Sequence, residues 1–195
     1  MWSNQGEAKE REREADMIPI IDTHQHMWDL NGLRLAWLKE GGPLTRHFVV
    51  ADYLAATQGL GFSRSVYMEV AGSPERIERD READWVLEQC RQGEAFPCAA
   101  VLGGDPAALD FRDYMSRFRD DPHVRGVRSM PPASSPHAFE TEEFVAGVRH
   151  LGELGMSFDI CVPPGLLGMG CKLVEACPET RFVVDHCANG DFRAF

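Results

Sequence analysis

The patterned part of the chain begins with Ile18-Pro19-Ile20-Ile21-Asp22-Thr23-His24-Gln25-His26. Its first four residues are apolar and mostly β-branched, which is typical of a buried β-strand. Asp22, His24 and His26 follow at intervals of two. Because alternate residues of a strand point to the same face, this spacing predicts that the three polar side chains enter one cavity at the end of the strand.

Five further strand candidates follow downstream, separated by segments with helical patterning. The predicted strands cover residues 65–70, 96–102, 124–130, 156–162 and 181–186, and the predicted helices cover 50–60, 73 to about 92, 109–118, a segment that Thr141 caps, and a segment that carries Leu173 and Val174. Strands that are apolar throughout, rather than alternating, indicate a parallel sheet covered on both faces.

The spacing of these units distinguishes a barrel from an open nucleotide-binding sheet. Six units in about 180 residues average about 30 residues each, as in a (β/α)8 barrel of eight strands and about 250 residues. The first strand leads into no glycine-rich phosphate-binding turn. The sequence therefore predicts an α/β fold, a TIM-type (β/α)8 barrel of which about the first six βα units are present. It forms one domain over residues 17–195, and we expect a flexible charged tail over residues 1–16.

Composition narrows the classes of partner. The 195 residues carry a formal net charge of −11 at pH 7, which disfavours nucleic acid and anionic membranes. No stretch approaches the roughly 18 to 20 apolar residues that cross a bilayer. Residues 5–16 are charged where a secretory signal would be apolar. We therefore expect no nucleic acid partner, no membrane partner and no export.

The cysteines predict a reducing compartment. The chain has six, at positions 90, 98, 161, 171, 177 and 187. No cysteine precedes Cys90, so disulfides would leave the first half of the chain unlinked. The sequence contains no CxxC pair, which argues against a structural zinc site. We expect reduced thiols in a cytoplasmic protein.

A further histidine closes the sixth predicted strand. His186 follows Val183-Val184-Asp185, and strand alternation sends His186 to one face and Asp185 to the other. Because barrel active sites lie at the carboxyl ends of the strands, His186 is predicted to face the same mouth as His24 and His26. Imidazoles at that place can converge on one metal ion or on one substrate, and the alternative is that they are structural histidines.

Three charged residues are weaker candidates. Asp159 lies within an apolar strand, where a carboxylate must be paired or liganded. Arg128 ends the strand Arg125-Gly126-Val127-Arg128 and could bind an anionic substrate through two hydrogen bonds. Glu69 lies near the end of the second strand. For each of them a structural salt bridge is the alternative, and the residues alone leave both open.

Several of these motifs, in this order, resemble the amidohydrolase-2 family. The motifs are Ile21-Asp22-Thr23-His24-Gln25-His26-Met27-Trp28-Asp29, Trp37-Leu38, Arg125-Gly126-Val127-Arg128, Phe158-Asp159-Ile160-Cys161 and Phe182-Val183-Val184-Asp185-His186. More narrowly, they resemble its lactonase-like branch, which includes fuconolactonase, sulfomuconolactone hydrolase and pyrone-dicarboxylate lactonase. The resemblance spans residues 18–195. It implies a barrel enzyme that opens a lactone or related ester by adding water.

The resemblance also implies roles for single residues. His24, His26 and His186 match the family's site histidines. In members that use a metal, these histidines would hold one divalent ion, with zinc the first candidate, and in other members they act without a metal. Asp159, Arg128 and Glu69 are the other catalytic candidates. The family places a catalytic aspartate at the end of strand eight, in a Gly-Ser-Asp-Trp-like run that this sequence does not contain. We therefore expect this chain to lack that carboxylate, the general base for the attacking water, together with two further βα units, and to be inactive or incomplete without them.

Two other functions stay open beside the lactonase. One is an amidohydrolase-type decarboxylase that acts on an aromatic or unsaturated carboxylic acid, and the other is a truncated relative without catalysis. Trp28-Asp29, Trp37-Leu38 and the strand that ends at Arg128 favour the lactonase branch. The expected partner is a small carboxylated lactone or acid, and self-association into a homo-oligomer is left open.

Overall fold

The computed structural model describes residues 18–70, 75–93, 96–130, 137–190 and 193, so the expected tail at 1–16 and the expected helix start at Ser73 lie outside the described residues. Strands and helices alternate along the chain. The elements are β1 (Ile20–Gln25), α2 (Val50–Thr57), β2 (Phe62–Met68), α3 (Arg76–Gln92), β3 (Ala99–Gly103), α4 (Phe111–Ser116), β4 (Val124–Ser129), η1 (Ala138–Glu140), α5 (Glu142–Glu153), β5 (Ser157–Ile160), η2 (Pro164–Leu166), α6 (Leu167–Ala176), β6 (Arg181–Val184) and η3 (Asp185–Asn189).

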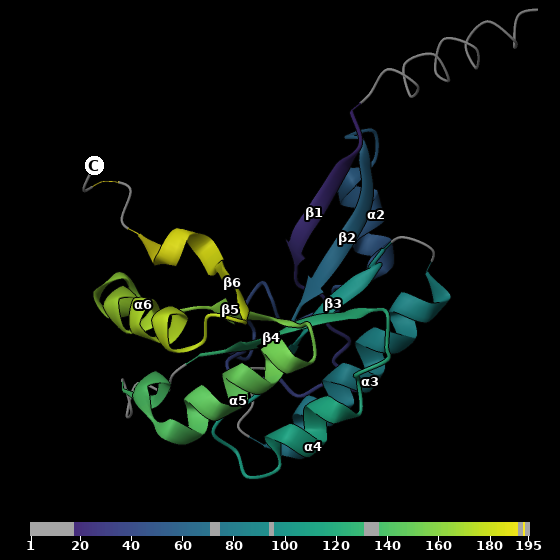
Figure 1. Ribbon diagram of the computed structural model, residues 1–195. Helices are drawn as coiled ribbons and strands as arrows, with labels where there is room; N and C mark the ends of the chain where they lie inside the picture. Colours follow the sequence, from purple (N-terminus) through teal and green to yellow (C-terminus); the bar gives the residue numbers. More distant parts are fainter. Residues whose placement is uncertain (1–17, 71–74, 94–95, 131–136, 191–192, 194–195) are drawn as a thin grey trace, which may run out of the picture.

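The six strands form one parallel sheet in the order β1-β2-β3-β4-β5-β6, so each strand pairs with its neighbours in sequence. Figure 1 shows that the sheet curls and that α3, α4, α5 and α6 lie on its outer side. The carboxyl ends of β1 and β6 converge on the inner side of the curl. This arrangement is a partial TIM-type barrel and confirms the predicted fold class.

Helix α5 illustrates how local sequence sets the layers. Its N-terminus is capped by Thr141, whose hydroxyl accepts a hydrogen bond from the Phe144 backbone N–H at 3.3 Å. Phe144, Val148 and Leu151 recur at helical spacing and are buried. Phe144 packs edge-to-face on Phe158 of β5, with ring centroids 5.7 Å apart. The main core therefore lies between the outer face of the sheet and its helices.

The two outermost strands are less buried than the sequence predicts. Ile20 and Ile21 of β1 are 43% and 54% exposed, and Val183 and Val184 of β6 are 47% and 48% exposed. The expectation of a buried first strand is therefore wrong. Both are edge strands with one paired neighbour each, so parts of their apolar faces lack a covering element among the described residues.

Two other expectations concern the whole chain. All six cysteines are free in the structure, with Cys90 and Cys177 buried and Cys171 and Cys187 exposed. Among the helices that the structure describes, none combines the length and the apolar composition that a membrane span requires.

Candidate active site

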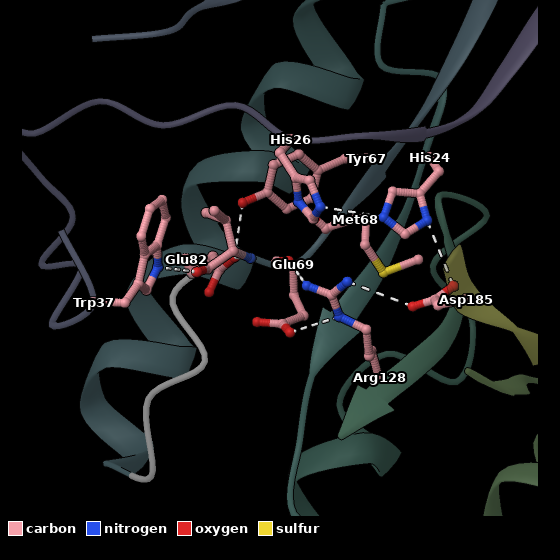
Figure 2. Close-up of polar contacts among 10 residues, drawn as sticks. His24, His26, Trp37, Tyr67, Met68, Glu69, Glu82, Arg128 and Asp185 are labelled. Carbon is pink, nitrogen blue, oxygen red and sulfur yellow. Dashed lines mark hydrogen bonds and ion pairs between the residues drawn. The ribbon is translucent and has the colours of Figure 1, made fainter. Parts of the chain in front are cut away.

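The two histidines of the first strand meet at its carboxyl end. The Nε2 atoms of His24 and His26 lie 3.1 Å apart (Figure 2). The edge of β1 is irregular here, with a register shift against β2 between Asp22 and Gln25. The HxH spacing thus brings both imidazoles together at the predicted end of the strand.

The other ring nitrogen of each histidine is held by the protein. His26 donates its Nδ1–H to the Met68 carbonyl oxygen at 3.0 Å, because a carbonyl can only accept. His24 Nδ1 faces Asp185 Oδ1 at 3.5 Å. When both rings are neutral, each Nε2 carries a lone pair that points to the same place. Two such acceptors at 3.1 Å repel each other unless a proton or a cation lies between them.

His186 completes a group of three imidazoles. Its ring centroid lies 4.5 Å from that of His24. One nitrogen atom from each of His24, His26 and His186 can be chosen so that all three lie within 4.8 Å of one another. Burial and the charge of Arg128 lower the pKa of His26 to about 4. Burial also lowers the pKa of His186. Both shifts favour neutral imidazole, which is the form that binds metals.

The backbone near His186 differs from the predicted strand. β6 ends at Val184, and residues 185–189 form η3, in which His186, Cys187, Ala188 and Asn189 have φ angles of 51°, 50°, 55° and 52°. Left-handed conformation costs L-residues about 1–2 kcal/mol each. Strand alternation therefore stops before Asp185, and the prediction that Asp185 and His186 face opposite sides is wrong. Both approach His24.

Asp22 departs from the predicted convergence of Asp22, His24 and His26. Its Oδ2 accepts a hydrogen bond from the Tyr53 hydroxyl of α2 at 3.1 Å. Its Oδ1 accepts from the His24 backbone N–H at 3.1 Å. The register shift after Asp22 breaks the simple alternation on which the prediction depends. Asp22 thus anchors the strand to α2 instead of joining the three imidazoles.

Arg128 links two carboxylates from distant strands. Its Nε donates to Glu69 Oε1 at 2.8 Å, its Nη2 donates to the Glu69 backbone carbonyl, and its Nη1 lies 3.4 Å from Asp185 Oδ2. The side chains of Arg128, Glu69 and Asp185 are buried, at 6%, 3% and 1% exposure. The salt bridge that was the alternative interpretation of Arg128 and Glu69 is present, and it lies beside the histidines (Figure 2).

Asp185 joins this ion pair to the imidazoles. One carboxylate oxygen faces His24 and the other faces Arg128. Burial alone would raise the pKa of Asp185, but hydrogen bonding to His24 and the charge of Arg128 outweigh it, and the net pKa is lowered. Asp185 is therefore ionised at neutral pH. It was not among the predicted site residues, although the dipeptide Asp185-His186 at a strand end was a signal that could have identified it.

Asp159 lies inside the barrel next to this network. It pairs in register with Arg128 across β4 and β5 and is 3% exposed. Its Oδ1 accepts a hydrogen bond from the Ser157 hydroxyl at 3.2 Å. Burial and the nearby Asp185 charge raise the pKa of Asp159 to about 6. A carboxyl group with this pKa can exchange a proton near neutral pH.

Two cavities meet at the site. The larger, of about 760 Å³, extends from His26 toward Trp28 and Trp37. The smaller, of about 430 Å³, is lined by His186 together with Cys161 and Asn189. His26, Arg128 and Met130 line both cavities, so His26 lies where the two volumes join and His186 faces the smaller one.

Comparison with known proteins places this geometry in a family. The family model described as Amidohydrolase matches residues 21–195. The uncharacterized protein y4mH of Sinorhizobium fredii is 22% identical over 187 residues, which make up 87% of this chain and 62% of that protein. The chain therefore spans less than two thirds of the length of this curated relative.

Solved structures match the fold over a similar share of their length. An amidohydrolase from Burkholderia multivorans with bound zinc matches with a TM-score of 0.72 and 20% identity, over 88% of this chain and 58% of that one. A candidate 2-pyrone-4,6-dicarboxylic acid hydrolase from Pseudomonas putida matches with a TM-score of 0.59 and 20% identity, over 88% and 58%. The 5-carboxyvanillate decarboxylase from Novosphingobium aromaticivorans, with manganese, matches with a TM-score of 0.64 and 12% identity, over 88% and 66%.

The family model covers nearly all of the described chain, from the first strand through the imidazole cluster. The curled parallel sheet agrees with the solved amidohydrolases. The chain belongs to the amidohydrolase family.

Proposed function

We propose that this chain carries the metal-binding part of the active site of a hydrolase that opens a lactone or related ester by adding water. The observation that carries the proposal is the cluster of His24, His26 and His186, whose ligand atoms lie within 4.8 Å of one another. This chain covers 58% of the length of the zinc-bound amidohydrolase. The reaction that we assign is therefore proposed for the whole protein, of which this chain supplies the metal-binding part.

The donor set suits a divalent metal such as zinc. Zinc binds histidine nitrogens at about 2.0–2.1 Å in tetrahedral geometry, so two such nitrogens lie about 3.3 Å apart. The 3.1 Å between the Nε2 atoms of His24 and His26 is close to this value. The carboxylate of Asp185 and the Met68 carbonyl oxygen hold the other ring nitrogens, an arrangement that orients metal ligands. A bound metal would polarise the substrate carbonyl and acidify a water molecule.

The chain's own groups have separate roles in this proposal. Asp159 is the candidate proton acceptor for the attacking water. It is a buried carboxylate beside the network, and when it is ionised its oxygens can only accept hydrogen bonds and protons. Arg128 and Glu69 are positioning residues. Three of the Arg128 donors are committed to Glu69 and Asp185, so its main role is to hold these carboxylates and not to capture substrate through two hydrogen bonds.

Metal binding and turnover test the proposal together. We expect the chain to bind one zinc ion, measured by competition with a chromophoric chelator, and expect His24→Ala, His26→Ala and His186→Ala each to abolish binding at that affinity. His137→Ala is the matched control, because His137 has an 80% exposed side chain and pairs with Glu140. Proton release from a lactone panel then measures hydrolysis by the whole protein, and the same loss of that activity in the three variants is expected. Equal zinc binding by wild type and the His24 and His186 variants would refute the site.

A decarboxylase is the second candidate. It is favoured by the structural match to the manganese-containing 5-carboxyvanillate decarboxylase, with a TM-score of 0.64. Release of carbon dioxide from aromatic acids, in the absence of proton release from lactones, would favour this reaction over ester hydrolysis. Both reactions would use the same imidazoles, so the histidine variants do not separate them.

A further inference from the structure

The larger cavity has an apolar wall next to the imidazoles. Of the nine described residues that line it, only His26 and Arg128 are polar. The others are Trp28, Ala36, Trp37, Leu44, Phe48, Val70 and Met130. Its volume of about 760 Å³ lies within the range of about 300–1,000 Å³ that is typical of small-molecule sites.

The two indoles of this wall present only carbon to the cavity. Trp28 Nε1 donates to the Arg46 carbonyl oxygen at 2.8 Å, and Trp37 Nε1 donates to the Val70 carbonyl oxygen at 2.7 Å. The rings are perpendicular, with centroids 5.7 Å apart. Because both N–H groups are already used, the indoles offer a bound molecule dispersion and edge-to-face contact, and no hydrogen bond.

Apolar side chains of this wall are also exposed. Trp37 and Leu44 are each 44% exposed, and Met130 is 49% exposed. Large apolar side chains that are exposed together beside a polar cluster are typical of a binding surface. The cavity continues to His26, where the smaller cavity with His186 begins, so a bound molecule could reach the imidazoles.

The positive charge of Arg128 is already balanced. Glu69 and Asp185 both pair with it, and its side chain is 6% exposed. Among the described lining residues there is no second arginine and no lysine. The segments 71–74 and 131–136, next to Val70 and Met130 in sequence, contain no lysine, arginine or histidine. Arg46 packs over the ring of Phe48 in this wall, but its guanidinium pairs with Asp52 and does not line the cavity. A charged group placed against the apolar wall would therefore lose water without gaining an unpaired counter-charge from the lining.

We propose that the substrate carries an uncharged aromatic or similarly flat apolar group that binds against Trp28, Trp37 and Leu44, with its reacting carbonyl at His26. The presence of a reacting carbonyl in this substrate rests on the proposed function. The preference for an uncharged flat group rests on the cavity alone. Burial of a flat apolar group in this wall supplies affinity through the hydrophobic effect. A lactone with ionised carboxylates on its ring is disfavoured there.

Equilibrium binding tests this preference without requiring turnover. Isothermal titration of the full chain, with and without zinc, compares dihydrocoumarin, a neutral aromatic lactone, with 2-pyrone-4,6-dicarboxylate, a planar dianion. We expect dihydrocoumarin to bind about tenfold more tightly or better. Trp37→Ala should weaken dihydrocoumarin binding about tenfold, while Trp37→Phe retains most of it. Leu109→Ala is the control, because Leu109 is fully exposed and does not line the cavity.

A charge introduced into the wall gives a second measurement. Leu44 is partly exposed, so Leu44→Arg should fold, and we expect it to raise affinity for the dicarboxylate and lower affinity for dihydrocoumarin. Tighter binding of the dicarboxylate by wild type, no binding of either lactone, or equal binding by wild type and Trp37→Ala would overturn the inference. Binding of dihydrocoumarin that depends on Trp37, without hydrolysis, would refute the proposed reaction and leave the inference standing. Hydrolysis of the dicarboxylate alone would support the proposed reaction and refute the inference about the substrate.

Discussion

His24 Nδ1 lies 3.5 Å from Asp185 Oδ1, although the two residues come from opposite edges of the sheet. β1 and β6 share no backbone pairing, so this side-chain contact joins the first and last strands directly. The contact exists because the sheet curls until the carboxyl ends of its edge strands converge (Figure 1). The geometry of the imidazole cluster therefore depends on the curvature of the whole sheet.

Asp185 should control metal affinity without being a ligand in the proposed set. Asp185→Asn keeps the size of the side chain but removes the charge that faces His24 Nδ1 and Arg128. Loss of such a supporting group typically weakens metal binding 10–100-fold, and we expect a loss of that order for zinc in chelator competition. Asp110→Asn, at an exposed carboxylate paired with Arg76, is the control. Unchanged zinc affinity in Asp185→Asn would show that the contact with His24 has no orienting role.

Glu69 and Arg128 should be strongly coupled in stability. Glu69→Gln leaves a buried guanidinium with one charged partner, and breaking a buried ion pair costs about 3–5 kcal/mol. We expect a fall of about 3 kcal/mol in the free energy of unfolding, measured with urea. The double variant Glu69→Gln/Arg128→Met removes both charges and should recover part of this loss. If the effects of Glu69→Gln and of Arg128→Met, each measured alone, simply add in the double variant, the two residues are not coupled.

The order of strands was predictable because it depends on local patterns. The strand candidate at residues 124–130 lies between the turn signals Asp121-Pro122 and Pro131-Pro132, and the observed β4 covers Val124–Ser129. Thr141 precedes two acidic residues and a helical apolar repeat, and it caps α5 as expected. Six such units at barrel spacing fix the neighbours of each strand, since a parallel sheet of βα units places consecutive strands side by side.

The details of the site depend on backbone features that the sequence pattern does not reveal. The register shift after Asp22 turns that carboxylate toward Tyr53. The left-handed segment that begins at His186 contains no glycine, which is the usual signal for such a conformation. Alternation therefore failed at Asp22 and at Asp185. Arg128 and Glu69 were identified as candidates, but their pairing depends on the approach of strands that are distant in sequence.

The cysteines should differ sharply in reactivity. Burial raises the pKa of Cys90 to about 12, so it holds almost no thiolate at neutral pH. Cys171 and Cys187 are exposed. With a chromogenic disulfide reagent and a chelator present, we expect these two thiols to react fast and Cys90 to react only after unfolding. Cys171→Ser and Cys187→Ser should each reduce the fast phase, whereas Cys90→Ser should leave it intact. A smaller fast phase in Cys90→Ser would contradict the burial.

Asp159 should make the protein less stable as pH rises. Its native pKa of about 6 lies above the value of 3.8 for an ordinary aspartate, so the native state binds more protons than the unfolded state between these values. The free energy of unfolding therefore falls with pH in this window, by up to about 3 kcal/mol in total. Asp159→Asn does not titrate there. We expect it to match wild type near pH 4 and to exceed it by up to about 3 kcal/mol at pH 7.

Urea unfolding with a chelator, from pH 4 to pH 7, measures the difference between variant and wild type. Asp52→Asn is a control with the opposite expected effect on stability. Hydrogen bonds from the Val49 backbone and from Arg46 lower the pKa of Asp52, so loss of this carboxylate should lower the free energy of unfolding at neutral pH. Parallel stability curves for wild type and Asp159→Asn would mean that Asp159 does not titrate in this window. If Asp159→Asn is more stable at pH 7 but no longer hydrolyses lactones, the buried carboxylate costs stability and serves the chemistry. That outcome would support its assignment as the proton acceptor.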